Sequence, residues 1–204
     1  MKTYCNSVFN IFQGERMSQA RVLNPQELRR VLDHLATRRH SARNRTMLLL
    51  THFAGMRVAE VAALRINDVL NDDKTIKNEI RLMPDQTKGK HARTVYLNEK
   101  MKKELVNYIK CLRIKDPTKP LFYTQKQAGF SANSLTQYFF YLYKACGLMG
   151  ASSHSGRRSF LTGLANKGTA IHILKSLAGH RNISTTATYL YSSPDQLKAA
   201  VELI

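Results

Sequence analysis

The chain has 204 residues, 43% of them hydrophobic, which is enough to bury the core of one domain of ordinary to large size. Its 32 Lys and Arg residues against 14 Asp and Glu give a net charge of +18, which favours a polyanionic partner, and nucleic acid fits better than an anionic membrane surface. The sequence contains no membrane span, secretory signal or paired cysteine spacing, so we expect a cytoplasmic protein without a disulfide framework or a structural zinc site.

The first predicted elements are helices. Residues 1–20 show little periodicity, and we expect them to form a leader or linker. Helical spacing begins after Asn24, a plausible N-cap followed by proline at the first helical position and glutamate at the third. Ser41 is predicted to cap a second helix that closes at Gly55. A third helix is expected over about 58–65.

The spacing of hydrophobic residues then changes from helical to that of strands. Residues 78–83 and 92–97 are predicted to be two strands, joined as a hairpin by the basic, glycine-containing loop 84–91. Helical spacing returns after Asn98, a predicted cap. The stretch 121–124, "LFYT", is expected to form a short strand.

The last third of the chain reads as helical. An aromatic helix is expected over 133–147, followed by two short helices over 156–168 and 170–179, each stopped by a glycine. Tyr189 is expected on or beside a further short helix, and the tail 193–204 has a capped amphipathic pattern. The predicted fold class is therefore α+β, mostly helical, with one small antiparallel sheet and no βαβ alternation.

Cleavage of a phosphodiester needs a nucleophile, an acid for the departing oxygen and positive charge for the nonbridging oxygens. Planar guanidinium groups match that charge in a bidentate way, and they must supply it where no carboxylate cluster holds metal ions. Four separated stretches of this sequence carry such groups: Arg57 in "AGMRVAE", Lys88 and Lys90 in "TKGKHAR", His154 and Arg157 in "HSGRR", and His180 and Tyr189 in "AGHRNISTTATY".

Taken singly, each of these residues has an ordinary structural explanation. Arg57 could be an exposed arginine at a helix start, and His154 a helix cap. Tyr189 is one of nine tyrosines and could cover a core, and Tyr191 is a rival nucleophile two residues on. The joint order and spacing of the set favour the chemical interpretation.

Over about residues 21–204 the four stretches resemble the tyrosine recombinases, also called the phage integrase family. The resemblance includes the arginine followed three residues later by Glu60, the lysine of the hairpin turn, the H-x-x-R pair, and the tyrosine nine residues after the G-H pair. The chain departs from the family at Gly156, where an apolar residue is usual. It resembles the family's catalytic domain standing without a separate N-terminal core-binding domain.

The resemblance implies a mechanism. Tyr189 would attack a DNA phosphodiester and form a covalent 3′-phosphotyrosyl link, with His154 as base and Lys88 protonating the departing 5′ oxygen. A second DNA end would reseal the link without ATP, metal or another cofactor. Arg57, Arg157 and His180 are the residues implied to bind the phosphate oxygens.

The implied function is that of a site-specific recombinase or integrase acting on double-stranded DNA as a homo-oligomer, a tetrameric synapse in this family. The C-terminal segment could pack on a neighbouring protomer or on its own domain. A DNA-binding protein without catalysis and a strand-relaxing enzyme of the type IB topoisomerase class remain alternatives. Four further basic residues are expected to touch phosphates: Arg43, Arg45, Lys90 and Arg93.

Overall fold

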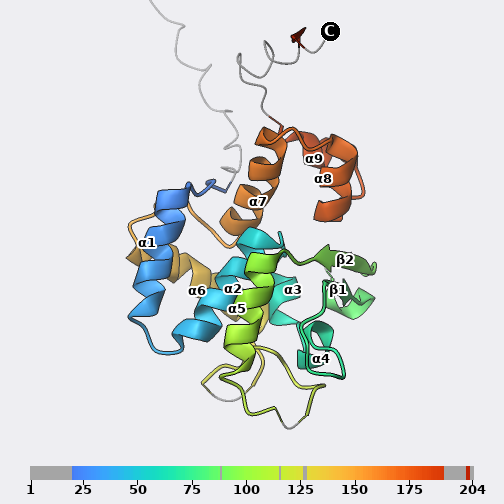
Figure 1. Ribbon diagram of the computed structural model, residues 1–204. Helices are drawn as coiled ribbons and strands as arrows, with labels where there is room; N and C mark the ends of the chain where they lie inside the picture. The colour runs from blue at the N-terminus through green and yellow to red at the C-terminus, as the bar shows by residue number, and fades with distance from the viewer. Residues whose placement is uncertain (1–19, 88, 115, 126–127, 191–200, 203–204) are drawn as a thin grey trace, which may run out of the picture.

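A computed structural model of the chain describes residues 20–87, 89–114, 116–125, 128–190 and 201–202 (Figure 1). The predictions for the leader, for Lys88, for Tyr191 and for the C-terminal tail fall wholly or largely outside these residues. The described part is a set of packed helices with one two-stranded antiparallel sheet, which confirms the predicted fold class. None of its helices is long and apolar enough to cross a membrane.

Two helices open the fold. The first, α1 (Pro25–Ala36), begins with the predicted capping box: the Asn24 side chain accepts from the Glu27 N–H at 2.8 Å, and the Glu27 carboxylate accepts from the Asn24 N–H at 3.0 Å. The second, α2 (Ser41–Phe53), corrects a prediction, because its N-cap is His40 and not Ser41. His40 takes a left-handed φ of 60°, and this turn places Ser41 already within the helix.

The helix predicted over 58–65 is shorter in the structure: α3 covers Val58–Ala62, and a separate short helix, α4 (Ile66–Val69), follows it. Helix α3 ends early because the chain between the two helices pairs with a distant segment. The Leu64 carbonyl accepts from the Leu121 N–H at 2.8 Å, and Arg65 forms an isolated bridge with Pro120. The strand expected at 121–124 is not formed, because the backbone of this stretch makes only isolated contacts: Leu121 bonds to Leu64, and Tyr123 forms a single bridge with Gly129.

The predicted hairpin is present. Strand β1 (Glu79–Leu82) pairs antiparallel with β2 (Arg93–Tyr96), and the loop between them begins with a 3-10 turn over Pro84–Gln86. Ile80 and Val95 face each other in the register and are both buried. Helix α5 (Glu99–Ile109) follows, and the Asn98 side chain caps it as predicted by accepting from the Met101 N–H at 2.9 Å.

Four more helices follow in the described part of the chain: α6 (Ala132–Ala145), α7 (Ser155–Asn166), α8 (Ile171–Ala178) and α9 (Ile183–Ala187). Glycines end α7 and α8 as predicted, because Gly168 and Gly179 take positive φ values of 80° and 60°, which L side chains rarely adopt. Tyr189 follows directly on α9.

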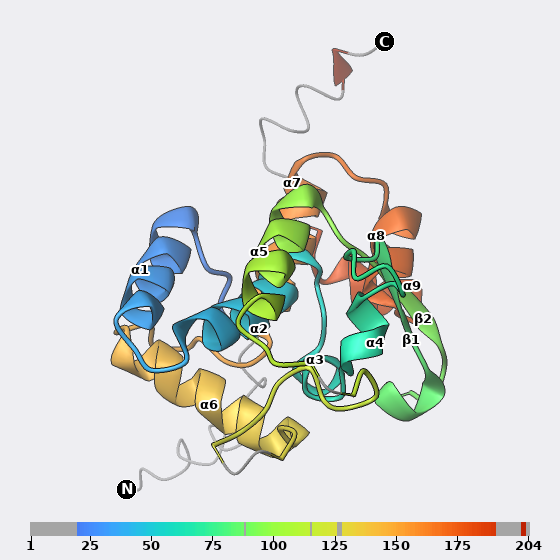
Figure 2. The ribbon, with the colours of Figure 1, turned by 60° about the horizontal axis from the view of Figure 1, so that its bottom comes forward.

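The core is organised around α2. Its residues Met47 to Leu50 are all fully buried, because α1, α5 and α7 pack around this helix. Helices α1 and α6 lie on one side of the molecule, while α8, α9 and the hairpin lie on the other (Figures 1 and 2). A Cβ on Gly156 would lie 2.1 Å from Thr51 Oγ1, so the glycine at this position is what allows α7 to approach α2. This approach sets Arg157 beside the end of α2.

Candidate functional site

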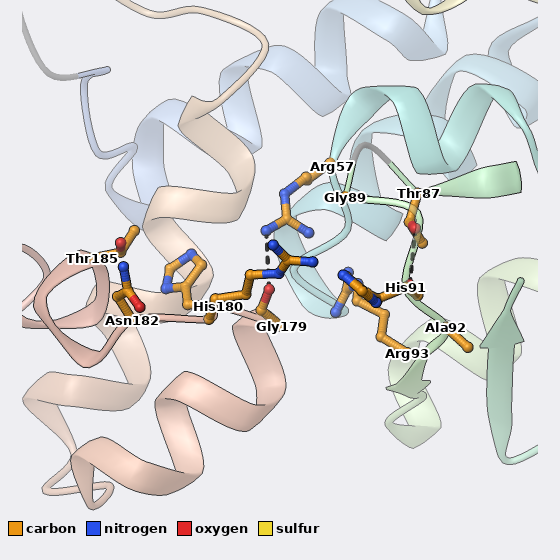
Figure 3. A pocket seen from close by; sticks show the side chains of 11 residues that line it. Arg57, Thr87, Gly89, His91, Ala92, Arg93, Gly179, His180, Asn182 and Thr185 are labelled. Atoms are coloured by element: carbon orange, nitrogen blue, oxygen red, sulfur yellow. Dashed lines mark hydrogen bonds between the residues drawn. The ribbon is translucent and has the colours of Figure 1, made fainter. Parts of the chain in front are cut away.

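A cleft of about 600 Å³ lies where the hairpin loop, the start of α3 and the segment after α8 meet (Figure 3). These segments are far apart in the sequence, and each contains one of the four stretches to which the sequence assigned phosphodiester chemistry. The lining residues are largely basic or small and polar: Arg57, Thr87, Gly89, His91, Ala92, Arg93, Gly179, His180, Arg181, Asn182 and Thr185.

Arg57 stands at the N-cap of α3 and is held from two sides. Its Nη1 donates to Glu60 Oε1 at 2.9 Å, and its backbone N–H donates to Glu60 Oε2 at 2.7 Å. Its Nη2 reaches across the cleft to the Gly179 carbonyl at 3.4 Å, a long contact visible in Figure 3. The guanidinium therefore points into the cleft, with its side chain 26% exposed.

Glu60 is fully buried and receives a second arginine. Arg93 donates from Nε to Glu60 Oε1 at 2.9 Å and from Nη2 to Oε2 at 2.6 Å. Burial of the carboxylate opposes its ionisation, but the hydrogen bonds and charge of Arg93, with those of Arg57, outweigh burial and lower the pKa of Glu60. The carboxylate is thus ionised and fixes both guanidinium groups.

Arg157, the third residue of α7, is buried next to the cleft. Its Nη1 donates to the Gly55 carbonyl at 2.6 Å and its Nη2 to the Ala178 carbonyl at 2.5 Å. Burial, and then the charges of Arg57 and Arg93, lower the pKa of Arg157 to about 9, so it remains a cation at neutral pH. Arg157 and Arg57 thus reach the carbonyls of two consecutive residues, Ala178 and Gly179.

His180 follows these carbonyls directly. Its Nε2 lies 3.1 Å from Arg157 Nη2, and its Nδ1 lies 3.0 Å from the Oγ1 of Thr186, a buried residue. Burial, followed by the charges of Arg157, Arg57 and Arg93, lowers the pKa of His180 to about 4. The imidazole is therefore neutral at physiological pH.

Tyr189 lies against His180. The two rings stack with centroids 5.9 Å apart and planes inclined by 19°. The Arg158 guanidinium lies 5.7 Å from the centroid of the Tyr189 ring. A negative charge on the Tyr189 oxygen would raise the pKa of Arg157. The phenol is therefore close enough to interact electrostatically with the buried guanidinium. The structure thus brings together four of the six residues implied to be catalytic, namely Arg57, Arg157, His180 and Tyr189.

Of the other two predicted residues, the structure describes only His154. His154 is exposed at the N-cap of α7, three residues before Arg157, and its backbone N–H donates to Ser152 Oγ at 3.3 Å. Lys88 lies outside the described residues. Its hairpin loop nonetheless borders the cleft through Thr87 and Gly89.

The predicted phosphate contacts do not gather at one place. Arg43 donates to the Tyr123 carbonyl at 2.5 Å, and Arg45 makes a bidentate ion pair with Glu104 at 2.8 and 2.6 Å, both away from the cleft. Lys90 is exposed in the hairpin loop. Arg93 lines the cleft, but its described hydrogen bonds go to the protein. As DNA contacts, these four residues stay predictions.

Sequence reasoning missed several residues around the site. His91 and Arg181 line the cleft, and Arg158 contacts the Tyr189 ring. Their adjacency to predicted residues was the available signal, since each lies within three positions of one. Thr186 belongs to the Ser- and Thr-rich stretch 184–188. Its Oγ1 contacts His180 Nδ1, and Thr188 Oγ1 in the same stretch donates to the Thr185 carbonyl at 2.8 Å.

Comparison with known proteins identifies relatives. The chain is 26% identical over 192 residues to the tyrosine recombinase XerD of Rickettsia conorii, covering 88% of this chain and 62% of that protein. It is 31% identical over 170 residues to a tyrosine recombinase of Pseudothermotoga lettingae, covering 83% of this chain and 55% of that protein. The chain therefore spans less than two thirds of the length of these relatives.

Solved structures share the fold. The crystal structure of XerA recombinase superposes with a TM-score of 0.70 at 20% identity, covering 89% of this chain and 64% of that chain. The Tn1549 transposon integrase in complex with a circular intermediate DNA gives a TM-score of 0.74 at 20% identity, covering 94% and 68%. The sequence profile of the phage integrase family matches residues 21–196. The chain belongs to the phage integrase family.

Proposed function

We propose that this chain is the catalytic part of a site-specific tyrosine recombinase, which cuts and rejoins DNA strands through a covalent 3′-phosphotyrosyl intermediate. One observation carries the proposal: two guanidinium groups, from Arg57 and Arg157, converge on consecutive carbonyls beside His180, and Tyr189 stacks on that histidine. A nucleophile next to paired guanidinium groups is what transfer of a phosphodiester requires.

The electrostatics of the cleft favour a bound phosphate. Arg57 and Arg93 act on Arg157 as like charges and lower its pKa, while Glu60 acts in the opposite direction. Glu60 already binds two of these three guanidinium groups, so positive charge remains in the cleft. A DNA phosphate placed there would exchange the long contact of Arg57 with a neutral carbonyl for charge-assisted hydrogen bonds.

In the proposed step, the Tyr189 oxygen attacks phosphorus and the bond from phosphorus to the 5′ oxygen breaks. The phenol proton passes to His154, and the 5′ oxygen takes a proton from Lys88. Arg57 and Arg157 hold the nonbridging oxygens as their charge grows, and His180 donates a hydrogen bond to one of them. The reverse reaction with a second DNA end rejoins the strand and frees the tyrosine. These reaction steps consume no ATP and use no cofactor.

The relatives support double-stranded DNA as the partner, because the Tn1549 integrase and the XerH recombinase among them have been solved in complex with DNA. The net charge of +18 fits such a partner. We further propose that the chain acts as a homo-oligomer on DNA, in the cytoplasm, with residues 21–204 as the catalytic domain.

The proposal is tested by covalent trapping. Wild-type protein and the Tyr189→Phe variant are expressed in cells and recovered under denaturing conditions, and the attached DNA is sequenced. We expect DNA on the wild type and none on the variant. Tyr191→Phe is the matched control, and it retains the adduct if Tyr189 is the nucleophile. DNA retained on Tyr189→Phe would contradict the assignment.

The trapped sequences then supply duplexes for assays in vitro. Recombinant products are expected from two such duplexes. Relaxation of a supercoiled plasmid carrying the site, with no recombinant product, would instead indicate an enzyme of the type IB topoisomerase class. If the wild type binds DNA but no covalent adduct is trapped in cells, the protein is a DNA-binding protein without catalysis.

A further inference from the structure

Arg93 joins three segments of the cleft through a single side chain. It comes from the first position of β2 and is only 9% exposed. Besides its two bonds to Glu60, its Nη1 donates to the Leu177 carbonyl at 2.9 Å. The guanidinium is therefore held by α3 on one side and by the end of α8 on the other.

Each segment that Arg93 touches carries a group of the proposed mechanism. Glu60, which it binds in a bidentate way, orients Arg57. Leu177 stands three residues before His180, in the turn where α8 ends. The strand that bears Arg93 closes the hairpin loop containing Lys88. Arg93 thus connects α3, the end of α8 and the hairpin through one side chain.

The packing around Arg93 is tight enough to transmit this placement. A Cβ at Gly179 would lie 2.7 Å from Arg93 Cδ, so the turn after α8 lies directly on the arginine stem. That turn presents the Gly179 carbonyl to Arg57 and continues into His180. A shift of Arg93 would therefore move both.

We propose that Arg93 is a positioning residue of the recombination reaction rather than a phosphate contact; this inference rests on the proposed function. Its planar, forked guanidinium serves Glu60 and the Leu177 carbonyl at once. A lysine ammonium, a single point of charge, cannot reproduce the bidentate pair together with the third bond. Loss of the fork leaves Glu60 buried with one fewer cation and frees the turn before His180.

The two roles differ in what the salt dependence of DNA binding shows. A residue that neutralises a phosphate contributes about 0.9 to the slope of log affinity against log salt. A positioning residue leaves that slope unchanged and slows the chemical step, because misplacement by about 1 Å can cost about 100-fold in rate. Affinity and rate therefore separate the hypotheses.

The experiment compares Arg93→Met with Arg81→Met, which removes an exposed arginine from the other strand of the same hairpin. Both are assayed on a nicked duplex bearing a trapped site, with single-turnover cleavage at saturating DNA. We expect Arg93→Met to cleave about 100-fold more slowly at an unchanged salt slope, and Arg81→Met to cleave like the wild type. Cleavage by Arg93→Met at the wild-type rate, or a salt slope lowered by about 0.9 with normal cleavage, overturns the proposal.

Two further variants keep the test decisive if Arg93→Met folds poorly. Arg93→Lys should restore part of the rate, because it keeps the charge and loses the fork. In a double-mutant cycle of Arg93→Met with Glu60→Gln, the double variant should cleave only a little more slowly than either single variant, since Arg93 acts largely through Glu60. Additive losses would contradict that route.

A measurement without DNA separates this inference from the proposed function. Hydrogen exchange of the Gly179 and His180 amides, which donate to the Ser176 and Lys175 carbonyls, should be faster in Arg93→Met than in the wild type. Unchanged exchange would show that Arg93 does not hold the turn. A wild type that forms no covalent adduct contradicts the proposed function, whatever the exchange result.

Discussion

The His180 imidazole accepts a hydrogen bond from the Arg157 guanidinium, with 3.1 Å between Nε2 and Nη2. A guanidinium can only donate, so His180 Nε2 carries no proton in this arrangement. With its pKa lowered to about 4, the ring is neutral and its proton lies on Nδ1, which donates to Thr186 Oγ1 at 3.0 Å. A hydroxyl can also donate, so Thr186 can support the opposite tautomer, in which Nε2 carries the proton and donates a hydrogen bond to a phosphate oxygen.

The first prediction concerns this tautomer. In DNA-free protein, the imidazole ¹⁵N spectrum should show His180 with its proton on Nδ1. Thr186→Val removes the buried acceptor and should cost about 1–3 kcal/mol of stability, because it leaves the Nδ1 donor unpaired. Cleavage should slow as well. Thr186→Ser keeps the hydroxyl and serves as the control, and a proton found on Nε2 in the wild type would refute the arrangement.

The second prediction concerns stability against pH. Burial, with the neighbouring arginine charges, lowers the pKa of His180 to about 4, and burial alone lowers that of His52 to about 4. Unfolded histidine binds its proton near pH ~6.5, so between about pH 6.5 and 4 the unfolded chain holds more protons. Stability should fall as pH decreases through this window.

Urea midpoints measured from pH 7 to pH 4.5 test this fall. The His52→Leu variant should lose less stability than the wild type over the same range, because one of the two groups is gone. Glu60 contributes in a separate pH window. Because folding lowers its pKa, Glu60 stabilises the fold at pH values above the pKa of the unfolded glutamate, and this stability is lost as the pH falls through the pKa of the folded one. A midpoint that stays constant from pH 7 to pH 5 contradicts the prediction.

The third prediction contrasts two glycines of α7. Gly156→Ala places a Cβ 2.1 Å from Thr51 Oγ1 and 2.9 Å from Thr51 Cβ, and overpacking of this kind costs about 1–3 kcal/mol. Gly163→Ala meets nothing within 4 Å and should gain about 1 kcal/mol from helix propensity. Chemical denaturation of the two variants measures the difference. Equal stabilisation by both would show that α2 and α7 do not approach so closely.

The fourth prediction separates two of the expected phosphate contacts. Lys90 is exposed beside the cleft, so Lys90→Met should lower the salt slope of DNA binding by about 0.9. Arg45 is paired with Glu104, so Arg45→Met should leave that slope unchanged and cost at most about 1 kcal/mol of stability. Titrations at several salt concentrations decide both. A lowered slope for Arg45→Met would mean that Arg45 leaves Glu104 to bind DNA.

Local features of the fold were predictable from the sequence, because neighbouring residues determine them. The capping box at Asn24 and the glycine after α8 depend on contacts within a few positions. The end of α3 and the segment 121–124 were not predictable, because their backbone groups pair with each other across more than 50 residues.

The same distinction holds at the site. Motif order indicated Arg57, Arg157, His180 and Tyr189, which the structure gathers. It could not indicate the partner of Arg93, since Glu60 lies 33 positions away and only the fold brings the two together. Motif order also could not explain why residue 156 is glycine, because the space for a side chain there is taken by Thr51, which is distant in the sequence.

The arginines of the cleft are anchored on main-chain oxygens of residues 55, 177, 178 and 179. Every amino acid presents the same carbonyl, so these anchors survive a change of side chain wherever the backbone path and the available volume are kept. Mutational drift can therefore remodel the outer face of this turn while the cationic centre keeps its shape. In a site built in this way, the side chains around the centre can change while the anchors of its arginines are kept.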